Sequence, residues 1–427
     1  MKFHFNHTQQ RARTIFCIDL KSFFASVSSI IRGLDPLTVK LAVVGNTEQQ
    51  GSVVLAATPK LKKLGIKTGS RLYEIQPSKD IIIVNPSMAE YVRISNDITE
   101  IFLKYVAPYD LHTLSIDESF LDVSDFKYQR LYKMTSWELA KVIQKDILDT
   151  TGITATVGMG PNLFLAKMAL YSAKKVKDGI DEWTMQDVPR KLWPLPLTEM
   201  YGINVRTERR LNRMGIFSVQ QLAKHPVALL KKEFGVLGLE LRQHANGMDE
   251  SQIDEPYIPV STSIGKSQIL MRDYVDIQEL KVLILEQLEE VCFRMRCMKK
   301  LCRTIHLSIG YSRTTGGGGF SHSYTLFEPT NITMELYKVC LHLFEIYYNQ
   351  SPVRQIGMSL TNFVEAEERQ LSIFEDVDKR GKEEKLALVM DEIRRKYGKN
   401  ALLRAVSYTS GSTAKYRNTL IGGHKSE

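Results

Sequence analysis

Short apolar runs of strand length alternate with segments of helical periodicity over the first part of the chain. Runs rich in β-branched and aromatic residues predict strands at 14–20, 40–45, 52–57 and 153–159. Helical periodicity predicts helices at 22–31, 60–64, 87–106 and 136–150. This alternation indicates an α/β core at the N-terminal end of the protein.

The pattern changes twice further along the chain. Prolines at 189, 194 and 196 mark a boundary, after which residues 197–250 have the pattern of a small helical unit. A second break falls at Glu255-Pro256-Tyr257-Ile258-Pro259. From about 260 to 363 we expect strand, helix (276–299), strand (303–311), strand (320–327), helix (332–348) and strand (357–363). This order predicts a separate βαββαβ domain.

Two features remain outside these elements. Gly316-Gly317-Gly318-Gly319 fits the central hairpin connection of the βαββαβ domain. A phosphate-binding loop is the weaker alternative, because no lysine-bearing helix follows the glycines. The last part of the chain combines an acidic linker, a short apolar motif, one amphipathic helix closed by Gly398 and a polar end.

Three carboxylates stand at the ends of apolar, strand-like segments. Asp19 ends one such segment, and Asp117 and Glu118 stand within Ser115-Ile116-Asp117-Glu118-Ser119 in another, 111–123. We expect both segments to be buried strands, and a buried acid needs a partner. Asp117 and Glu118 can face one cavity only if the chain turns there, which predicts a hairpin with this pentapeptide at its tip. A divalent cation would offset their repulsion. The alternative to a metal site is that Asp117 and Glu118 are solvated on the hairpin and that Asp19 stands in its strand by chance.

Composition limits the class of protein. The 427 residues are 43% hydrophobic and 25% charged, which is typical of a globular protein with three or four domains. Lys and Arg number 57 against 48 Asp and Glu, an excess that permits a polyanionic partner without identifying one. No apolar run reaches the roughly 18 residues of a membrane span, and no secretory signal is present, so we expect a cytoplasmic protein without a membrane partner. Cys292, Cys297 and Cys302 lack zinc-ligand spacing and are expected to be reduced core thiols.

Three separated blocks together resemble the active site of the Y-family translesion DNA polymerases. They are Asp19-Leu20-Lys21-Ser22-Phe23-Phe24-Ala25, the acidic hairpin, and residues 157–167, in the order and spacing of that family. The resemblance extends over residues 13–363 and is greatest for the UmuC-type branch, particularly the ultraviolet-damage repair polymerases of Gram-positive bacteria and their mobile elements. The ending Leu420-Ile421-Gly422-Gly423-His424 fits the same branch.

The resemblance implies a multidomain α+β fold shaped as a right hand. The α/β palm would comprise residues 1–31 and 86–190, with small fingers at 32–85. A helical thumb with a helix-hairpin-helix would follow at 191–252, and a βαββαβ little finger at 258–363. Residues 364–427 would form a C-terminal tail.

The resemblance also implies template-directed, low-fidelity DNA synthesis past damage. Asp19, Asp117 and Glu118 would be the catalytic metal ligands, with the Leu20 carbonyl completing one coordination sphere. Two Mg²⁺ ions would be the cofactors, with Mn²⁺ as a substitute. One ion would lower the pKa of the primer 3′-hydroxyl and the other would bridge the triphosphate of the incoming dNTP.

Nucleotide contacts follow from the same resemblance. Phe24 matches the sugar-facing aromatic whose ring leaves no room for a ribose 2′-hydroxyl, and Phe23 stands beside it. Lys167 would reach a phosphate oxygen as a flexible point charge. Pro59 and Lys62 occupy the positions where the family usually has Tyr and Arg, and a lysine cannot make the bidentate contact of a guanidinium. Whether Lys62 contacts the triphosphate therefore stays open. Lys60, Lys63 and Arg71 are the alternative residues for this contact.

DNA would be held mainly through its phosphates. Gly202, Ile203 and Asn204 resemble a helix-hairpin-helix turn followed by Arg206, and Asn204 replaces the usual second glycine because Asn tolerates a left-handed backbone. Such contacts position DNA without reading its sequence. Candidate phosphate contacts in the little finger are Ser261, Ser263, Lys266, Arg303 and Arg313.

A short motif in the tail predicts a protein partner. Gln370-Leu371-Ser372-Ile373-Phe374 follows the acidic segment 365–368 and resembles the pentapeptide by which bacterial polymerases dock on the sliding clamp, the beta subunit. Gln370 and Ile373 would accompany two apolar anchors, Leu371 and Phe374. The alternative is a strand that packs on its own protein.

Other functions stay open on sequence alone. One is a non-catalytic scaffold bound to DNA and clamp in the damage response, against which the intact acids Asp19, Asp117 and Glu118 argue. Another is a different two-metal phosphotransferase, such as a nucleotide cyclase on a similar palm. The sequence also leaves open which lesions are bypassed and whether a UmuD-like protein or a recombinase filament is required as a partner.

Overall fold

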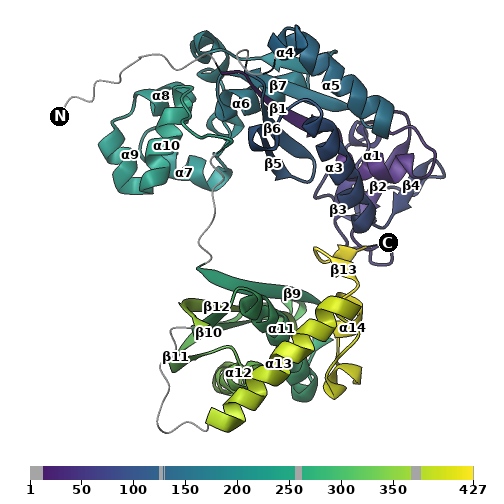
Figure 1. Ribbon diagram of the computed structural model, residues 1–427, viewed down its shortest axis with the longest axis vertical. Helices are drawn as coiled ribbons and strands as arrows, with labels where there is room; N and C mark the ends of the chain where they lie inside the picture. Colours follow the sequence, from purple (N-terminus) through teal and green to yellow (C-terminus); the bar gives the residue numbers. More distant parts are fainter. Residues whose placement is uncertain (1–12, 125–127, 129, 255–261, 367–376, 427) are drawn as a thin grey trace. The chain divides into compact units, whose positions relative to one another are not determined.

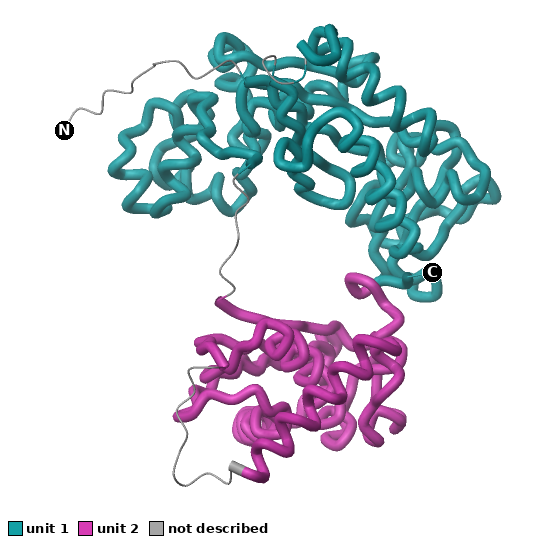
Figure 2. The backbone as a smooth tube through the Cα atoms, in the orientation of Figure 1, with its two compact units in different colours: residues 1–257, 424–427 teal, residues 258–423 magenta. Residues whose placement is uncertain are grey.

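The computed structural model describes residues 13–124, 128, 130–254, 262–366 and 377–426. Two compact units make up the chain, the first from residues 1–257 with 424–427 and the second from 258–423 (Figure 2). Within the described ranges, no helix is both long and apolar enough to cross a membrane. All five cysteines are free thiols. Cys297 is exposed, so its expected place in a core was wrong, whereas the other four are buried.

A five-stranded sheet lies at the centre of the first unit, in the order β5-β6-β1-β7-β8 (Figure 1). Its strands are β1 (Ile15–Leu20), β5 (Leu111–Ser115), β6 (Glu118–Asp122), β7 (Ala155–Gly160) and β8 (Ile180–Glu182). The middle strand β1 is buried, as its apolar run predicts, and pairs antiparallel with β6 and β7. The expectation of burial was wrong for β5, because an edge strand has a neighbour on one side only.

Helices cover both faces of this sheet. On one face, α3 (Met88–Leu103) and α5 (Ser136–Thr151) pack against Phe16 and Ile18 of β1. On the other face, α6 (Leu163–Ala173) packs against Cys17. The approach of α6 requires a glycine in β7, because a Cβ atom at Gly158 would lie only 2.2 Å from the carbonyl oxygen of Ala166. The alternation of side chains along β1 therefore decides which residues face α6.

A smaller three-stranded sheet in the order β3-β2-β4 lies in the same unit. Its strands are β2 (Lys40–Val44), β3 (Val54–Ala57) and β4 (Ile81–Val84). The first unit also contains the helices α1 (Phe23–Ile30), α2 (Pro59–Lys62) and α4 (Arg130–Tyr132). Strand β4 was missed by the sequence analysis, because four apolar residues are too few to separate a strand from a loop. It pairs parallel with β2.

Four helices of the first unit form a bundle joined to α6. They are α7 (Val205–Arg213), α8 (Val219–Lys224), α9 (Val227–Phe234) and α10 (Val236–Ala245). The His244 ring on α10 stacks on Phe164 of α6, with ring centroids 4.5 Å apart. The Asn162 side chain, which caps α6, also donates to the Gly247 carbonyl at 2.8 Å. Helix α6 is thus fixed between the sheet and the bundle.

The second unit contains the βαββαβ order that the sequence predicts. Its elements are β9 (Ser263–Tyr274), α11 (Ile277–Cys297), β10 (Lys300–Tyr311), β11 (Gly319–Thr330), α12 (Thr333–Tyr347) and β12 (Val353–Glu365). The strands form one antiparallel sheet in the order β11-β10-β12-β9. Gly316, Gly317 and Gly318 lie between β10 and β11, Gly319 begins β11, and all four have positive φ.

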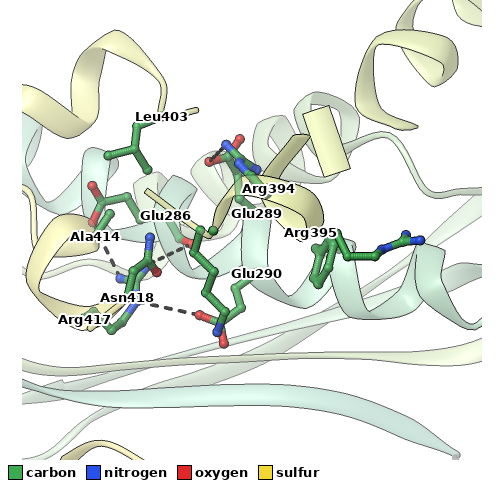
Figure 3. Close-up of a pocket in the computed structure, with 12 residues that line it drawn as sticks. Glu286, Glu289, Glu290, Arg394, Arg395, Leu403, Ala414, Arg417 and Asn418 are labelled. Carbon is green, nitrogen blue, oxygen red and sulfur yellow. Dashed lines mark hydrogen bonds and ion pairs between the residues drawn. The ribbon is translucent and has the colours of Figure 1, made fainter. Parts of the chain in front are cut away.

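The C-terminal segment packs on α11 of the second unit (Figure 3). Its elements in this unit are α13 (Val377–Tyr397), α14 (Ala414–Arg417) and the short strand β13 (Leu420–Ile421), whereas β14 (His424–Lys425) belongs to the first unit. Arg296 of α11 forms an ion pair with Asp391 of α13, and their side chains are only 5% and 4% exposed. Glu289 accepts from Arg404 at 2.6 Å and from Arg394 at 3.4 Å. Breaking such buried pairs is costly, so residues 377–417 belong structurally to the second unit.

Stability should depend on pH through His244. Burial lowers the pKa of His244 in the folded protein, so the unfolded chain binds more protons below its ordinary value of about 6.5. Stability is therefore lost as pH falls through this range. His244→Phe keeps a ring on Phe164 and cannot titrate. Between pH 7.5 and 5.5 we expect the wild-type melting temperature to fall about 2–4 °C further than that of the variant. Equal falls in both proteins would contradict this prediction.

Candidate active site

Two of the three predicted acids lie directly opposite each other. Asp19 of β1 pairs with Glu118 of β6 in the antiparallel ladder. The chain turns between β5 and β6 as the sequence predicts, which leaves Asp117 at the hairpin tip. The Asp117 carboxylate accepts from Ser115 Oγ at 2.8 Å, and its backbone carbonyl accepts from the Leu20 amide at 2.9 Å. All three acids therefore lie at one end of adjacent strands.

Helix α6 brings two ammonium groups to these acids. Lys167 and Lys174 are seven residues apart, two helical turns, so they lie on the same side of α6. The Lys167 ammonium pairs with Glu118, and the two side chains are only 8% and 12% exposed. Lys174 Nζ lies 2.9 Å from Asp19 Oδ2 and its side chain is 42% exposed. Both acids are thus largely buried, whereas Lys167 is buried and Lys174 is partly exposed.

The acids influence one another electrostatically. Burial raises the pKa of Asp19, and the nearby charges of Asp117 and Glu118 raise it further, while Lys174 opposes both effects. Burial and Glu118 hold the pKa of the Cys17 thiol well above its usual value. That thiol therefore stays protonated and donates to Glu118 Oε1 at 3.2 Å. The three carboxylates form a single electrostatic site.

This site fits a divalent cation by its donor chemistry. Among the described residues, no group of three or more His, Cys, Asp or Glu side chains is already arranged around a metal position. The charges of Glu118 and Asp19 are instead balanced by Lys167 and Lys174. Carboxylate oxygens from adjacent strands are nevertheless the ligands that Mg²⁺ prefers. A bound cation would also relieve the carboxylate repulsion that, after burial, contributes to the raised pKa of Asp19.

A cavity of about 610 Å³ opens beside Asp19. Lys62 and Lys174 line it, and Lys62 Nζ donates to Ser22 Oγ at 2.8 Å. Burial lowers the pKa of Lys62, and the neighbouring charge of Lys174 acts in the same direction. Lys174 was missed by the sequence analysis, although its seven-residue spacing from Lys167 was a usable signal.

The two aromatic residues of α1 have different surroundings. Phe23 is only 2% exposed and lies in the core of the sheet. Phe24 is half-buried and stacks on Tyr91 of α3, with ring centroids 4.4 Å apart and planes 13° apart. The Tyr91 hydroxyl shares a 2.6 Å hydrogen bond with Ser28 Oγ, which fixes that ring in turn. Phe24 is therefore a rigid surface close to Asp19 in sequence.

The helix-hairpin-helix turn at residues 202–204 has a different backbone conformation from the one that the sequence predicted. Gly202 has the left-handed backbone, with φ +89°, and Ile203 is buried. Asn204 has φ −97°, so the expected left-handed conformation was wrong. Its side chain caps α7 by accepting from the amides of Arg206 and Thr207, both at 2.9 Å, and an N-cap requires extended backbone. These two amides already have an acceptor.

The sheet of the second unit has an open face rich in small polar residues. A shallow depression on it is lined by Gly265, Ser267, His306, Ser308, Gly357 and Ser359, among others. Ser263 is exposed, whereas the Lys266 ammonium pairs with Glu290 of α11. Arg303 and Arg313 are exposed. Ser261 and the 370–374 motif lie outside the described residues. The small polar residues were missed, because hydroxyl groups carry little signal in a sequence.

Known proteins resemble this chain over nearly its whole length. Residues 18–171 match the impB/mucB/samB family, residues 261–373 match the C-terminal domain of that family, and residues 186–216 match the IMS family HHH motif. The "Putative UV-damage repair protein UvrX" of Bacillus subtilis (strain 168) is 50% identical over 425 residues, 99% of this chain and 100% of that protein. "DNA polymerase IV 2" of the same strain is 37% identical over 422 residues, 97% of this chain and 99% of that protein.

A solved structure agrees at the level of the fold. It is the "Y-family DNA polymerase chimera Dbh-Dpo4(243-245)-Dbh", with a TM-score of 0.64, 22% identity, and coverage of 82% of this chain and 99% of that one. The sheet with α6 and the acids accordingly corresponds to a palm, the four-helix bundle to a thumb and the βαββαβ unit to a little finger. The chain therefore belongs to the impB/mucB/samB family of Y-family translesion DNA polymerases.

Proposed function

We propose that this protein extends a DNA primer along a damaged template by two-metal nucleotidyl transfer. The observation that carries this proposal is the register of β1 and β6, which sets Asp19 opposite Glu118 with Asp117 at the adjoining hairpin tip. Whole-length similarity to proteins named as a DNA polymerase and a UV-damage repair protein supports it. Three acids at one end of a palm are what in-line phosphoryl transfer requires.

The residues around the site have separate tasks in this mechanism. Asp19, Asp117, Glu118 and the Leu20 carbonyl would hold two Mg²⁺ ions, or Mn²⁺ as a substitute. When bound, these ions activate the primer hydroxyl and neutralise the departing pyrophosphate. Lys167 pairs with Glu118 and fixes that carboxylate in place.

The dNTP would lie between the palm and the fingers. Lys174 and Lys62 offer ammonium groups to its triphosphate from the cavity beside Asp19. Because both are lysines, each would act as a point charge and not as a bidentate clamp. Loose contacts of this kind suit low-fidelity synthesis.

DNA would be bound without sequence readout. The thumb hairpin at 202–204 with Arg206, and the open face of the little-finger sheet with Ser263, offer phosphate contacts. The tail motif at 370–374 would recruit the enzyme to the sliding clamp, with Leu371 and Phe374 as the anchors.

Primer extension tests the catalytic role of the acids. Asp117→Asn should lower Mg²⁺-dependent extension by about a hundredfold or more, because the metal site loses one charge. Its Kd for primer-template DNA should stay within about twofold of the wild-type value. Extension by the variant at the wild-type rate would refute the mechanism. A wild-type protein that binds DNA without extending it would instead be a scaffold.

Sugar selection tests the position of Phe24. Phe24→Ala removes the ring that would meet a 2′-hydroxyl, so ribonucleotide insertion relative to deoxynucleotide insertion should rise about tenfold or more. Phe24→Tyr keeps the ring and is the matched control. Tyr91→Leu removes the stacked support and should give a smaller rise. Single-nucleotide insertion kinetics measure all three, and an unchanged ratio in Phe24→Ala would remove this role.

Clamp-dependent synthesis tests the tail motif. Phe374→Ala removes one apolar anchor, so stimulation of primer extension by the sliding clamp should largely disappear. Extension without clamp should be unaffected, because the motif is distant in sequence from the catalytic acids. Full stimulation of the variant by clamp would argue against docking through this motif.

A further inference from the structure

The cavity beside Asp19 extends along the palm beyond the residues that the nucleotide would use. Its near end is lined by Lys62 and Lys174. Its far wall is formed by α5 and by the turn that follows α6, which contribute Lys141, Lys145 and Lys177. At about 610 Å³, the whole cavity has the size of a small-molecule site. Six lysines and two aspartates, Asp19 and Asp178, are its charged lining among the described residues.

The far wall has a defined structure. Gln144 of α5 donates to the Ala155 carbonyl at 2.9 Å and to the Gly179 carbonyl at 3.2 Å, which joins α5 to the start of β7 and to the turn. Lys141 and Lys145 are one helical turn apart on the same side of α5 as Gln144. The lysines therefore stand on a hydrogen-bonded framework next to the sheet that carries Asp19.

The protein neutralises only part of the charge of this wall. Lys141 lies 3.8 Å from Asp178, and both side chains are more than half exposed, at 54% and 59%. In the described part of the chain, Lys145 and Lys177 take part in no ion pair. Like charges four residues apart on a helix destabilise it, so the pair Lys141 and Lys145 does not stabilise α5. An anion between these lysines would remove that repulsion.

The lining also indicates which anion. Among the residues that the structure describes, no aromatic side chain lines the cavity, so none of them offers a ring on which a nucleobase would stack. The other lining residues near these lysines include the aliphatic Leu148 and Val176, the polar Gln144 and Thr154, and one acid, Asp178. Ammonium groups on flexible stems suit phosphate oxygens, which they contact as point charges.

We propose that the far wall, through Lys141, Lys145 and Lys177, is a second polyphosphate site that receives inorganic pyrophosphate after nucleotidyl transfer. This proposal rests on the proposed function, because pyrophosphate is the product released when a dNTP is joined to a primer. The site accepts the product on the wall formed by α5 and the turn after α6, and it forms or breaks no covalent bond.

Direct binding of inorganic tripolyphosphate tests this site without requiring turnover. Calorimetry would use the full-length protein in EDTA, without DNA, so that metal at the acids does not contribute. The triple variant Lys141→Gln/Lys145→Gln/Lys177→Gln should bind tripolyphosphate about tenfold more weakly than the wild type. A matched control, Lys382→Gln/Lys385→Gln/Lys396→Gln on α13, removes the same charge from the second unit and should change the affinity less than twofold.

Steady-state kinetics then distinguish a site for the product pyrophosphate from a site for the substrate dNTP. In the far-wall variant, the inhibition constant of pyrophosphate should rise about tenfold while the KM for dNTP changes less than twofold. An unchanged tripolyphosphate affinity would overturn the site. A parallel rise of KM and the inhibition constant would also overturn it, because the lysines would then serve the nucleotide. If the wild type fails to extend primers but the variant still loses tripolyphosphate binding, the proposed function fails and the anion site stands.

Discussion

The pairing of two lysines on one helix with two carboxylates on one sheet is the interaction on which this structure depends. Asp19 and Glu118 face each other across β1 and β6, with Asp117 beside them, and burial together with the charges of Asp117 and Glu118 raises the pKa of Asp19. Lys167 and Lys174 offset that repulsion in the structure. The arrangement requires α6 to lie close to the sheet, and the glycines of β7 permit this approach.

Helix α6 connects the acids to the rest of the first unit. One side of it packs on β1 and β6, and the other joins the thumb core through Phe164. Its cap residue Asn162 and its neighbour His244 attach the thumb directly to this helix. Lys167, which pairs with Glu118, is buried, whereas Lys174, which pairs with Asp19, is partly exposed. The same helix therefore supplies one enclosed ammonium group and one that solvent reaches. The palm and thumb thus share one structural element beside the candidate active site.

Local patterns in the sequence predicted most of the elements, because strands with branched apolar residues and helices with regular periodicity depend little on distant contacts. The hairpin that carries Asp117 and Glu118 was predicted from the conflict between two adjacent acids and strand geometry. Lys174 was missed, because its role depends on how α6 lies against β1. The conformation of Asn204 was wrong, because side-chain capping of α7 outweighs the left-handed preference of the usual hairpin. The packing of α13 on α11 depends on ion pairs between distant segments, which a single sequence does not reveal.

The central claim is that the three acids hold divalent ions beside a primer terminus. Electron paramagnetic resonance titration with Mn²⁺ measures this directly, on the protein bound to a dideoxy-terminated primer-template and the next correct dNTP. Two bound Mn²⁺ per protein, reduced to one or none by Asp19→Asn, is the result that this account predicts. An equal number of bound ions in wild type and Asp19→Asn would contradict it.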